Sequence, residues 1–310
     1  MLKKDLLSIY DLDGSDIARI VKSAARLKRL QREGAVHESL KGKMLGLLFD
    51  KSSTRTRISF EVGMYQLGGM ATFLSQRDMQ LGRGETVADT ARVVSRYLDG
   101  MVIRTFSQDL VTEFAASAGI PVINGLTDLS HPCQILSDLL TIEEKKGRYE
   151  GLKIAYVGDG NNIAHSWINA AVRIPLHLSL GCPEGYGPDA GILERGMKAS
   201  EGRIVLHRSP DEAASEADVI YTDTWASMGQ EAEREERIAA FQAYQVNDRL
   251  LGHAGDDVIV MHCLPAHRGE SITDEVIDGP RSVVMDQAEN RLHVQKAILD
   301  ILMGGEGYEG

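Results

Sequence analysis

The chain has 310 residues, of which 43% are hydrophobic and 25% are charged, a composition that excludes intrinsic disorder and is typical of two globular domains. Its formal net charge is −11, with 45 acidic against 34 basic side chains, so the field of the whole molecule repels nucleic acid and acidic membrane surfaces. No apolar stretch reaches the ~18 residues of a membrane span, and the first residues lack the apolar core of a signal peptide. We therefore expect a cytoplasmic protein with neither nucleic-acid nor membrane partners.

Short runs of Val, Ile and Leu alternate with longer amphipathic segments, the pattern of parallel strands connected by helices. In chain order, this pattern predicts strands at residues 44–49, 70–74, 100–104, 120–123, 153–158, 176–180, 203–207, 218–222, 257–261 and 282–285. It predicts helices at residues 14–33, 54–67, 86–98, 108–118, 133–146, 161–173, 189–200, 232–243 and 287–303. The expected fold class is α/β, with doubly wound parallel sheets.

A charged, glycine-containing stretch at residues 143–151 separates a predicted helix from the next strand, which is typical of a domain boundary. We predict a first domain at residues 1–147 and a second at residues 148–286. The last predicted helix carries apolar residues that need a surface to cover, so residues 287–310 are expected to pack back onto the first domain. The two domains are expected to flank an active-site cleft.

Residues 49–61 run from an apolar strand into a helix through consecutive hydroxyl and guanidinium side chains. A helix N-terminus offers N–H donors and partial positive charge, and arginine adds a bidentate fork, so the segment suits an anion such as phosphate. The alternative is that Ser52 or Ser53 only caps the helix, while Arg55 and Arg57 lie in solvent.

Two further polar positions of the first domain lie where ligands of α/β proteins collect. Arg104 closes the predicted strand 100–104, at the carboxyl end where a catalytic cation would be displayed. His131 and Gln134 belong to a His-Pro-Cys-Gln sequence that begins a helix, and both are expected to face the same pocket. The alternatives are that Arg104 is only a polar residue at the edge of a strand and that His131 is only a surface or capping residue.

In the second domain, residues 157–163 follow a strand and open a helix, but Ile163 stands where a dinucleotide fingerprint has its third glycine. A phosphate cradle is therefore disfavoured there. Asn162 either presents its amide to a small polar ligand or caps the helix. Asp223 and Cys263 each follow another predicted strand, and together they can line a crevice that recognises a cationic amine. Alternatively, the cysteine is a small buried apolar residue.

The chain contains three cysteines, Cys133, Cys182 and Cys263. Their odd number and wide spacing argue against a disulfide framework and against a CxxC-type zinc site. We therefore expect reduced thiols, no metal centre and no cofactor.

Taken together, these motifs resemble those of the ornithine carbamoyltransferases, in the same order and over nearly the whole chain. The resemblance rests on residues 53–57 (STRTR), Arg104, residues 131–134 (HPCQ), 158–162 (GDGNN), 223–229 (DTWASMG), 262–265 (HCLP) and 290–291 (NR). The STRT and HPxQ elements are shared by carbamoyltransferases generally. The DTWASMG and HCLP elements are characteristic of the ornithine enzymes, so the expected substrate depends on them.

The resemblance implies direct transfer of the carbamoyl group of carbamoyl phosphate to the δ-amine of L-ornithine, through a tetrahedral intermediate, giving L-citrulline and phosphate in arginine biosynthesis. The implied carbamoyl phosphate-binding residues are Ser53, Thr54, Arg55, Thr56, Gln80, Arg104, His131, Gln134, Cys263, Leu264 and Arg291. The implied ornithine-binding residues are Asn162, Asp223, Ser227 and Met228. The implied catalytic residues are Arg104, His131, Thr56 and Cys263, with no nucleophilic role for the cysteine. In a homotrimer, Gln80 would reach the neighbouring subunit's site.

Other functions fit the sequence less well. A carbamoyltransferase for aspartate, putrescine or an acylated ornithine is disfavoured by residues 227–229 and 263–264. A nucleotide-binding α/β protein is disfavoured by the broken glycine pattern, and a catalytically silent phosphate-binding module by the amine-binding motifs. The direction of the reaction in the cell and any stacking of trimers stay open.

Overall fold

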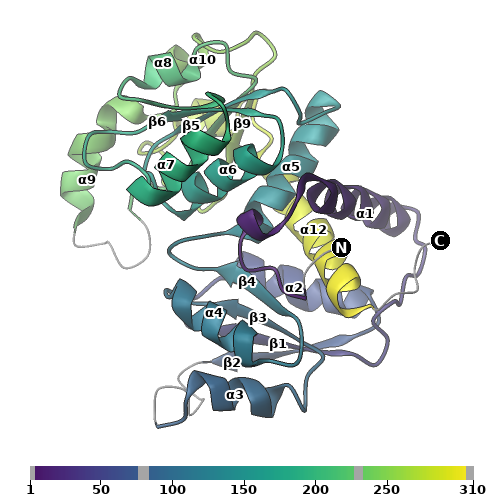
Figure 1. Ribbon diagram of the computed structural model, residues 1–310. Helices are drawn as coiled ribbons and strands as arrows, with labels where there is room; N and C mark the ends of the chain where they lie inside the picture. The colour runs from purple at the N-terminus through teal and green to yellow at the C-terminus, as the bar shows by residue number, and fades with distance from the viewer. Residues whose placement is uncertain (1–3, 76–83, 227–232, 305–310) are drawn as a thin grey trace. The chain divides into compact units, whose positions relative to one another are not determined.

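The computed structural model describes residues 4–75, 84–226 and 233–304, which Figure 1 draws as a coloured ribbon. Helices and strands alternate along these residues, and every pair of neighbouring strands is parallel. The prediction of two parallel-sheet α/β domains is thereby confirmed. No helix within the described ranges is long and apolar enough to cross a membrane.

The chain divides into two compact units. One contains Met1–Leu140 together with Glu289–Gly310, and the other contains Thr141–Ala288. The divisions fall within α5 (Pro132–Lys146) and α12 (Val284–Met303), so each of these helices contributes residues to both units.

The first unit is built on a four-stranded sheet with the spatial order β2-β1-β3-β4. Its strands are β1 (Met44–Phe49), β2 (Met70–Ser75), β3 (Gly100–Arg104) and β4 (Val122–Leu126). β1 pairs with β2 on one side and β3 on the other, and both central strands are almost wholly buried. Continuous apolar runs such as Leu45–Phe49 are what strands covered on both faces require.

Helices cover both faces of this sheet. They are α1 (Gly14–Arg32), α2 (Thr54–Gln66), α3 (Val87–Val94) and α4 (Gln108–Ser117), with the 3-10 turn η1 (Ile9–Asp11) before α1. Ala91 of α3 and Phe114 of α4 share one apolar core with Met101 of β3. Figure 1 shows α2 and α12 on the side of the sheet opposite α3.

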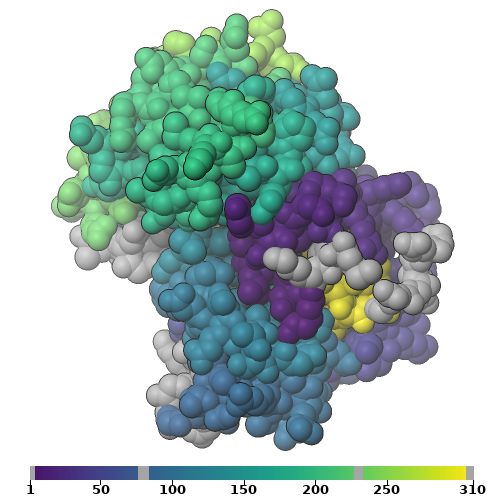
Figure 2. Space-filling model, viewed as in Figure 1, coloured from purple at the N-terminus to yellow at the C-terminus, as the bar shows by residue number. Residues whose placement is uncertain are grey.

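From Glu289 onward, α12 is part of the first unit. Its Asn290 accepts a hydrogen bond from Lys28 Nζ of α1 at 2.7 Å, and Lys296 donates to Gln31 and Gln66. In the view of Figure 2, only a small part of this yellow helix reaches the surface. Several polar residues of α12, among them Asn290, Arg291 and Lys296, are therefore buried in the first unit.

The second unit is built on a five-stranded sheet with the order β7-β6-β5-β8-β9. Its strands are β5 (Lys153–Val157), β6 (His177–Gly181), β7 (Ile204–His207), β8 (Val219–Thr222) and β9 (Ile259–His262). Its helices are α6 (Asn162–Arg173), α7 (Ala190–Ala199), α8 (Pro210–Ala214), α9 (Arg234–Phe241), α10 (Asp248–Leu251) and α11 (Asp274–Ile277), with the 3-10 turn η4 (Gln242–Tyr244). Tyr221 packs against Tyr156 and Trp167, with ring centroids 6.0 and 5.7 Å apart, and so joins the sheet to α6.

Both sheets have a point where the strand order reverses. In the first unit, β1 lies between β2 and β3, and in the second, β5 lies between β6 and β8. Connections on either side of such a point leave toward opposite faces, and ligands bind beyond the carboxyl ends of the strands there. The segments that follow β1, β3, β5 and β8 are therefore the places in each unit where a binding site is expected.

One predicted strand is wrong. Residues 282–285 do not form a strand: Ser282 makes only an isolated bridge to Val260, and α12 begins at Val284. The reason is that the carbonyl of Val283 accepts a hydrogen bond from Gln287 N at 2.9 Å, so this apolar run is the start of a helix. The prediction also omits the short helices α8, α10 and α11, which are too brief to show a periodic pattern.

One of the predicted helices is shorter in the structure than the sequence predicts. The helix expected at residues 86–98 is α3 and stops at Val94. Ser95 bonds back to the Ala91 carbonyl at 2.6 Å and accepts a hydrogen bond from Gly119 N at 3.0 Å. A local side-chain bond of this kind competes with continuation of the helix.

Candidate active site

The segment after β1 forms the N-terminus of α2, as the sequence predicts. Ser53 caps the helix, its Oγ accepting a hydrogen bond from Thr56 N at 3.2 Å. Arg57 is exposed and donates to Glu61 at 2.9 Å, so the structure contains both the Ser53 cap and the exposed Arg57 of the alternative interpretation. Arg55 is also exposed, at the positive end of the helix, where it is available to an anion.

Thr56 is the buried member of this segment, and two guanidinium groups contact it. Arg104, the last residue of β3, is 6% exposed and donates to Thr56 Oγ1 at 3.5 Å. Arg291 of α12 donates to the same oxygen at 3.1 Å. Three elements that are distant in sequence therefore gather two positive charges around one hydroxyl group.

His131 and Gln134 join this cluster from the start of α5. Arg291 Nη1 lies 3.4 Å from His131 Nε2 and donates to Gln134 Oε1. The Gln134 amide nitrogen donates in turn to Asp138 at 2.8 Å. All these side chains belong to the first unit and are buried, so the structure brings together the predicted residues Thr56, Arg104, His131, Gln134 and Arg291.

The imidazole of His131 is held neutral. Burial lowers its pKa well below the usual 6.5, and the positive charges of Arg291, Arg104 and Arg55 lower it further. A neutral imidazole that accepts a hydrogen bond at Nε2 carries its proton on Nδ1, so it can act as a hydrogen-bond donor without adding a third charge. The cluster thus offers cationic and neutral donors to an oxygen that gains negative charge.

We expect the unfolding free energy to fall more steeply between about pH 7 and 5 in the parent chain than in a His131→Asn variant. The unfolded chain protonates this histidine near its ordinary pKa of about 6.5, whereas the folded chain keeps it neutral to well lower pH. In that window the unfolded state binds more protons, so stability that is present above the unfolded pKa is lost as the pH falls. Urea unfolding at several pH values measures this, with His253→Asn, an exposed position, as the control. Equal slopes in all three proteins would contradict it.

The segment between β1 and α2 also contains a buried lysine that was not predicted as a site residue. Lys51 pairs with the Asp128 carboxylate, and its Nζ lies 4.0 Å from the centre of the Phe106 ring. It therefore ties the segment after β1 to the loop after β4. The available signal was a lysine two residues after an apolar strand.

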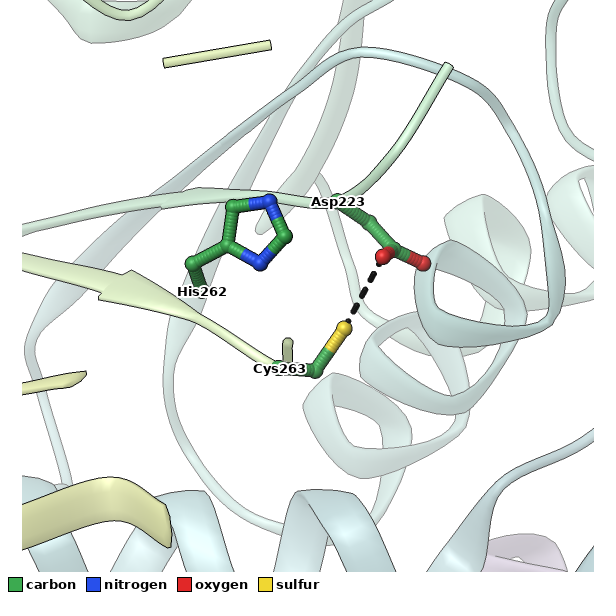
Figure 3. A group of neighbouring side chains, drawn as sticks. All are labelled: Asp223, His262 and Cys263. Atoms are coloured by element: carbon green, nitrogen blue, oxygen red, sulfur yellow. Dashed lines mark hydrogen bonds between the residues drawn. The ribbon is translucent and has the colours of Figure 1, made fainter. Parts of the chain in front are cut away.

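In the second unit, the Asp223 carboxylate follows β8 and is held on both oxygens. Oδ2 accepts a hydrogen bond from Asn161 Nδ2 at 2.8 Å, and Oδ1 accepts from Thr224 N at 2.7 Å and from Cys263 Sγ at 3.0 Å. Figure 3 shows the Asp223 and Cys263 side chains pointing toward one another, beside His262. A fixed, largely buried carboxylate of this kind suits a cationic amine.

The residue that caps α6 is Asn161, which the sequence interpretation did not single out. Its Oδ1 accepts hydrogen bonds from Ile163 N at 2.9 Å and from Ala164 N at 3.4 Å, while its amide nitrogen holds Asp223. The capping alternative for Asn162 is therefore wrong: that residue is the first of the helix. The adjacent asparagines gave no signal to separate the two roles.

Gly160 is needed for packing rather than for phosphate. Its N–H donates to the Tyr186 carbonyl at 2.9 Å, and an added Cβ would lie 2.1 Å from the backbone nitrogen of Pro188. The close approach of the segment around Tyr186 thus explains a glycine-rich turn that lacks the rest of the dinucleotide pattern.

We expect Asn161→Ser and Asn161→Ala to separate the two roles of this side chain. Serine retains a helix cap, so the unfolding free energy of the alanine variant should be about 1 kcal/mol lower than that of the serine variant. Neither can reach Asp223, so both should weaken binding of an amine there by about tenfold, the effect of a lost charge-assisted hydrogen bond. Thermal unfolding and amine titration measure the two effects. A serine variant that binds the amine as the parent does would contradict the assignment.

His262, at the end of β9, is locked by hydrogen bonds. Its Nδ1 accepts from Leu264 N at 3.0 Å, so the proton is on Nε2, which lies 3.3 Å from Ser271 Oγ. Asp223, His262 and Cys263 also place potential metal-ligating atoms within 4.8 Å of one another. Because both imidazole nitrogens and the thiol proton already serve protein contacts, this trio fits a hydrogen-bonded network better than a metal centre.

Of the remaining predicted site residues, the structure describes two and leaves three outside its described ranges. Thr54 is the exposed first residue of α2, and Leu264 follows Cys263 with a φ of +56°, an uncommon conformation for a residue with a side chain. Gln80, Ser227 and Met228 lie outside the described residues.

Comparisons with known proteins agree with these features. The carbamoyl phosphate-binding domain of the aspartate/ornithine carbamoyltransferases matches residues 4–144, and their Asp/Orn-binding domain matches residues 150–302. The chain belongs to the aspartate/ornithine carbamoyltransferase family.

Relatives within this family are close. The ornithine carbamoyltransferase of Syntrophus aciditrophicus is 68% identical over 97% of this chain and 100% of its own length. That of Thermococcus kodakarensis is 54% identical over 97% of each chain. The solved structure of ornithine carbamoyltransferase from Pyrococcus furiosus has a TM-score of 0.94 and 51% identity, over 98% of each chain.

Proposed function

We propose that this chain is an ornithine carbamoyltransferase, which transfers the carbamoyl group of carbamoyl phosphate to the δ-amine of L-ornithine and releases L-citrulline and phosphate. The observation that carries the proposal is the cluster in which Arg104 and Arg291 contact Thr56 beside the neutral His131. Family membership and the fixed carboxylate of Asp223 support the same function.

The phosphate of carbamoyl phosphate would be held at the start of α2. Phosphate suits the partial positive charge of a helix N-terminus, hydroxyl donors and an arginine fork. The proposed phosphate ligands are Ser53, Thr54, Arg55, Thr56 and Arg104, with Gln80 added from the neighbouring subunit.

The carbamoyl group itself would lie against the buried cluster. Arg104, His131 and Thr56 are the proposed donors to its carbonyl oxygen, and they are already gathered in the first unit. Gln134 is the proposed partner of the carbamoyl amino group, because its amide oxygen is an acceptor. Arg291 would hold His131 and Gln134 in place.

Ornithine would be bound by residues of the second unit. Asp223 is proposed to pair with the α-ammonium group, together with Asn162, Ser227 and Met228. Cys263, whose thiol donates to Asp223, and Leu264 are proposed to lie near the reacting end of the substrates.

The chemistry requires no covalent intermediate on the enzyme. The neutral δ-amine attacks the carbamoyl carbon, and the electrons of the carbonyl move onto its oxygen, where Arg104 and His131 stabilise the negative charge. The bond from carbon to the phosphate oxygen then breaks, and phosphate leaves with the proton released by the amine. Because a free δ-ammonium group has a pKa near ~10, a site that favours the neutral amine raises the reactive fraction.

A steady-state assay with a panel of amine acceptors tests this function. With carbamoyl phosphate present, L-ornithine should give citrulline with a kcat/KM far above those of aspartate, putrescine and N-acetylornithine. A higher kcat/KM for any of these other acceptors would overturn the assignment of ornithine while leaving carbamoyl transfer in place.

We also propose that the active form is a homotrimer that acts in the cytoplasm in arginine biosynthesis. The first unit has exposed apolar side chains on α2 and on the edge strand β2: Ile58 is 52%, Tyr65 80% and Met70 66% exposed. An open sheet edge flanked by apolar groups favours association with another copy. Free cysteines are compatible with a reducing compartment.

Hybrid trimers test the shared site. Arg55→Ala and Gln80→Ala proteins should each be nearly inactive. If Gln80 serves the neighbouring subunit, random mixing at equal amounts restores an intact site in about a quarter of positions. Activity should therefore rise toward about a quarter of the parent value after subunit exchange. A fully active monomer in sedimentation, or no recovery in mixtures shown to exchange, would contradict the proposal.

A further inference from the structure

Arg237 of α9 is a buried arginine to which the proposed reaction assigns no role. It is 7% exposed, and its guanidinium group makes contacts with two separate segments of the second unit. Nη1 donates to the Trp225 carbonyl at 2.9 Å, and the same nitrogen lies 3.2 Å from Asp159 Oδ2. Its Nε donates to Glu233 within α9 at 3.1 Å.

These contacts lie on both sides of the Asp223 network. Asp159 belongs to the turn after β5 and comes two residues before Asn161, which holds Asp223 Oδ2. Trp225 belongs to the segment after β8 and comes two residues after Asp223. One guanidinium group therefore joins the two segments whose side chains meet at the carboxylate.

The aromatic surroundings restrict the guanidinium group further. It lies over the ring of Tyr186 at 5.1 Å from the ring centre, and Tyr186 accepts a hydrogen bond from Gly160 N through its carbonyl. Phe241 packs against both Tyr186 and Trp225, with centroid distances of 4.9 and 5.8 Å. The guanidinium group of Arg237 thus makes polar contacts through its nitrogens while its plane lies over an aromatic ring. A lysine cannot make both kinds of contact.

We propose that Arg237 is a positioning residue for ornithine binding, which fixes the Asp223 carboxylate through Asp159 on one side and the Trp225 carbonyl on the other. The inference rests on the proposed function, because it takes Asp223 as the partner of the substrate amine. A stabilising role alone is a weaker explanation, since desolvation offsets most of the attraction in a buried ion pair.

The ionisation of Asp159 agrees with this arrangement. Burial raises the pKa of its carboxyl group to about 6, Arg237 opposes that rise, and the Asp223 and Glu233 carboxylates add to it. Without the guanidinium group, Asp159 would favour its protonated form nearer neutral pH. Loss of Arg237 would also remove the contact that links Asp159 to α9.

Steady-state kinetics of Arg237→Met and Arg237→Lys test the positioning role. Arg237→Met should raise the KM for ornithine about tenfold or more, while the KM for carbamoyl phosphate stays within about twofold. Arg237→Lys should recover part of the loss because it keeps the charge opposite Asp159. Arg249→Met is the matched control, since Arg249 also forms an ion pair in this unit but is exposed. A fall in kcat with an unchanged KM for ornithine in Arg237→Met would overturn the proposal.

Tryptophan fluorescence provides a readout that does not depend on turnover. The chain has two tryptophans, so a Trp167→Phe background leaves Trp225 as the reporter. In that background, Arg237→Met should make Trp225 more accessible to acrylamide, and Arg249→Met should not. Unchanged quenching in Arg237→Met would overturn the positioning role alone. Failure of the parent chain to form citrulline would instead overturn the proposed function, and with it the assignment to ornithine.

Discussion

Replacing Arg55 by alanine should reduce kcat/KM for carbamoyl phosphate on the order of 10²–10³-fold, the effect of removing a donor from developing negative charge. The guanidinium group lies at the positive end of α2, and phosphate is both the bound group and the leaving group in the proposed reaction. Because Arg55 is exposed, the variant should fold as the parent does. Steady-state kinetics and circular dichroism measure the two expectations.

Arg96→Ala is the matched control for this variant. It removes one positive charge from an exposed position just beyond α3 in the same unit. Its kcat/KM should stay within about twofold of the parent, because long-range electrostatic effects at the surface are screened by salt. Arg55→Ala with parent-like kinetics would remove Arg55 from the site.

Replacing Asp223 by asparagine should raise the KM for ornithine about 10- to 100-fold and leave the KM for carbamoyl phosphate nearly unchanged. A charge-assisted contact with the α-ammonium group, about 1.5–3 kcal/mol, becomes a neutral one. The new amide also faces Asn161 Nδ2 and Thr224 N, which both donate to the present carboxylate. One of these donors would then meet an NH2 group. Putrescine, which lacks both α-substituents, should be a poor acceptor for the parent because the polar groups of the site stay unpaired.

Asp248→Asn is the control for the aspartate variant. Asp248 is exposed in the first turn of α10, in the same unit, and it should tolerate the change. Similar kcat/KM values for ornithine and putrescine in the parent would defeat the assignment of Asp223. An Asp223→Asn variant with unaltered ornithine kinetics would do the same.

The parts of the fold that the sequence predicts well are those with a strong local pattern. The bounds predicted for β1 and β3 are the observed ones, because each is a short apolar run with a charged residue at its end or directly after it, Arg104 in β3 and Asp50 after β1. The run at residues 282–285 has the same local pattern but begins α12, because Gln287 bonds back to Val283. No local signal separates these two cases, since the deciding hydrogen bond belongs to the following helix.

In the candidate site, too, some residues could be predicted from the sequence and others could not. Arg104 is predicted from its place at a strand end and Thr56 from the family resemblance of a segment that begins a helix, and the structure brings the two together. The role of Asn161 could not be predicted, because either asparagine of the pair could cap α6 until the backbone conformation was known. Arg237 gave no signal, since its contacts with Asp159 and with the Trp225 carbonyl depend on how the chain folds and not on a local sequence pattern.

The most direct test of the central claim follows the carbamoyl carbon. Carbamoyl phosphate labelled with ¹³C is mixed with the parent chain and L-ornithine, without added nucleotide, and the products are followed by ¹³C and ³¹P NMR. The label should appear in the ureido carbon of citrulline, with one phosphate released for each citrulline formed. Label that appears only in bicarbonate, with phosphate released but no citrulline, would contradict it.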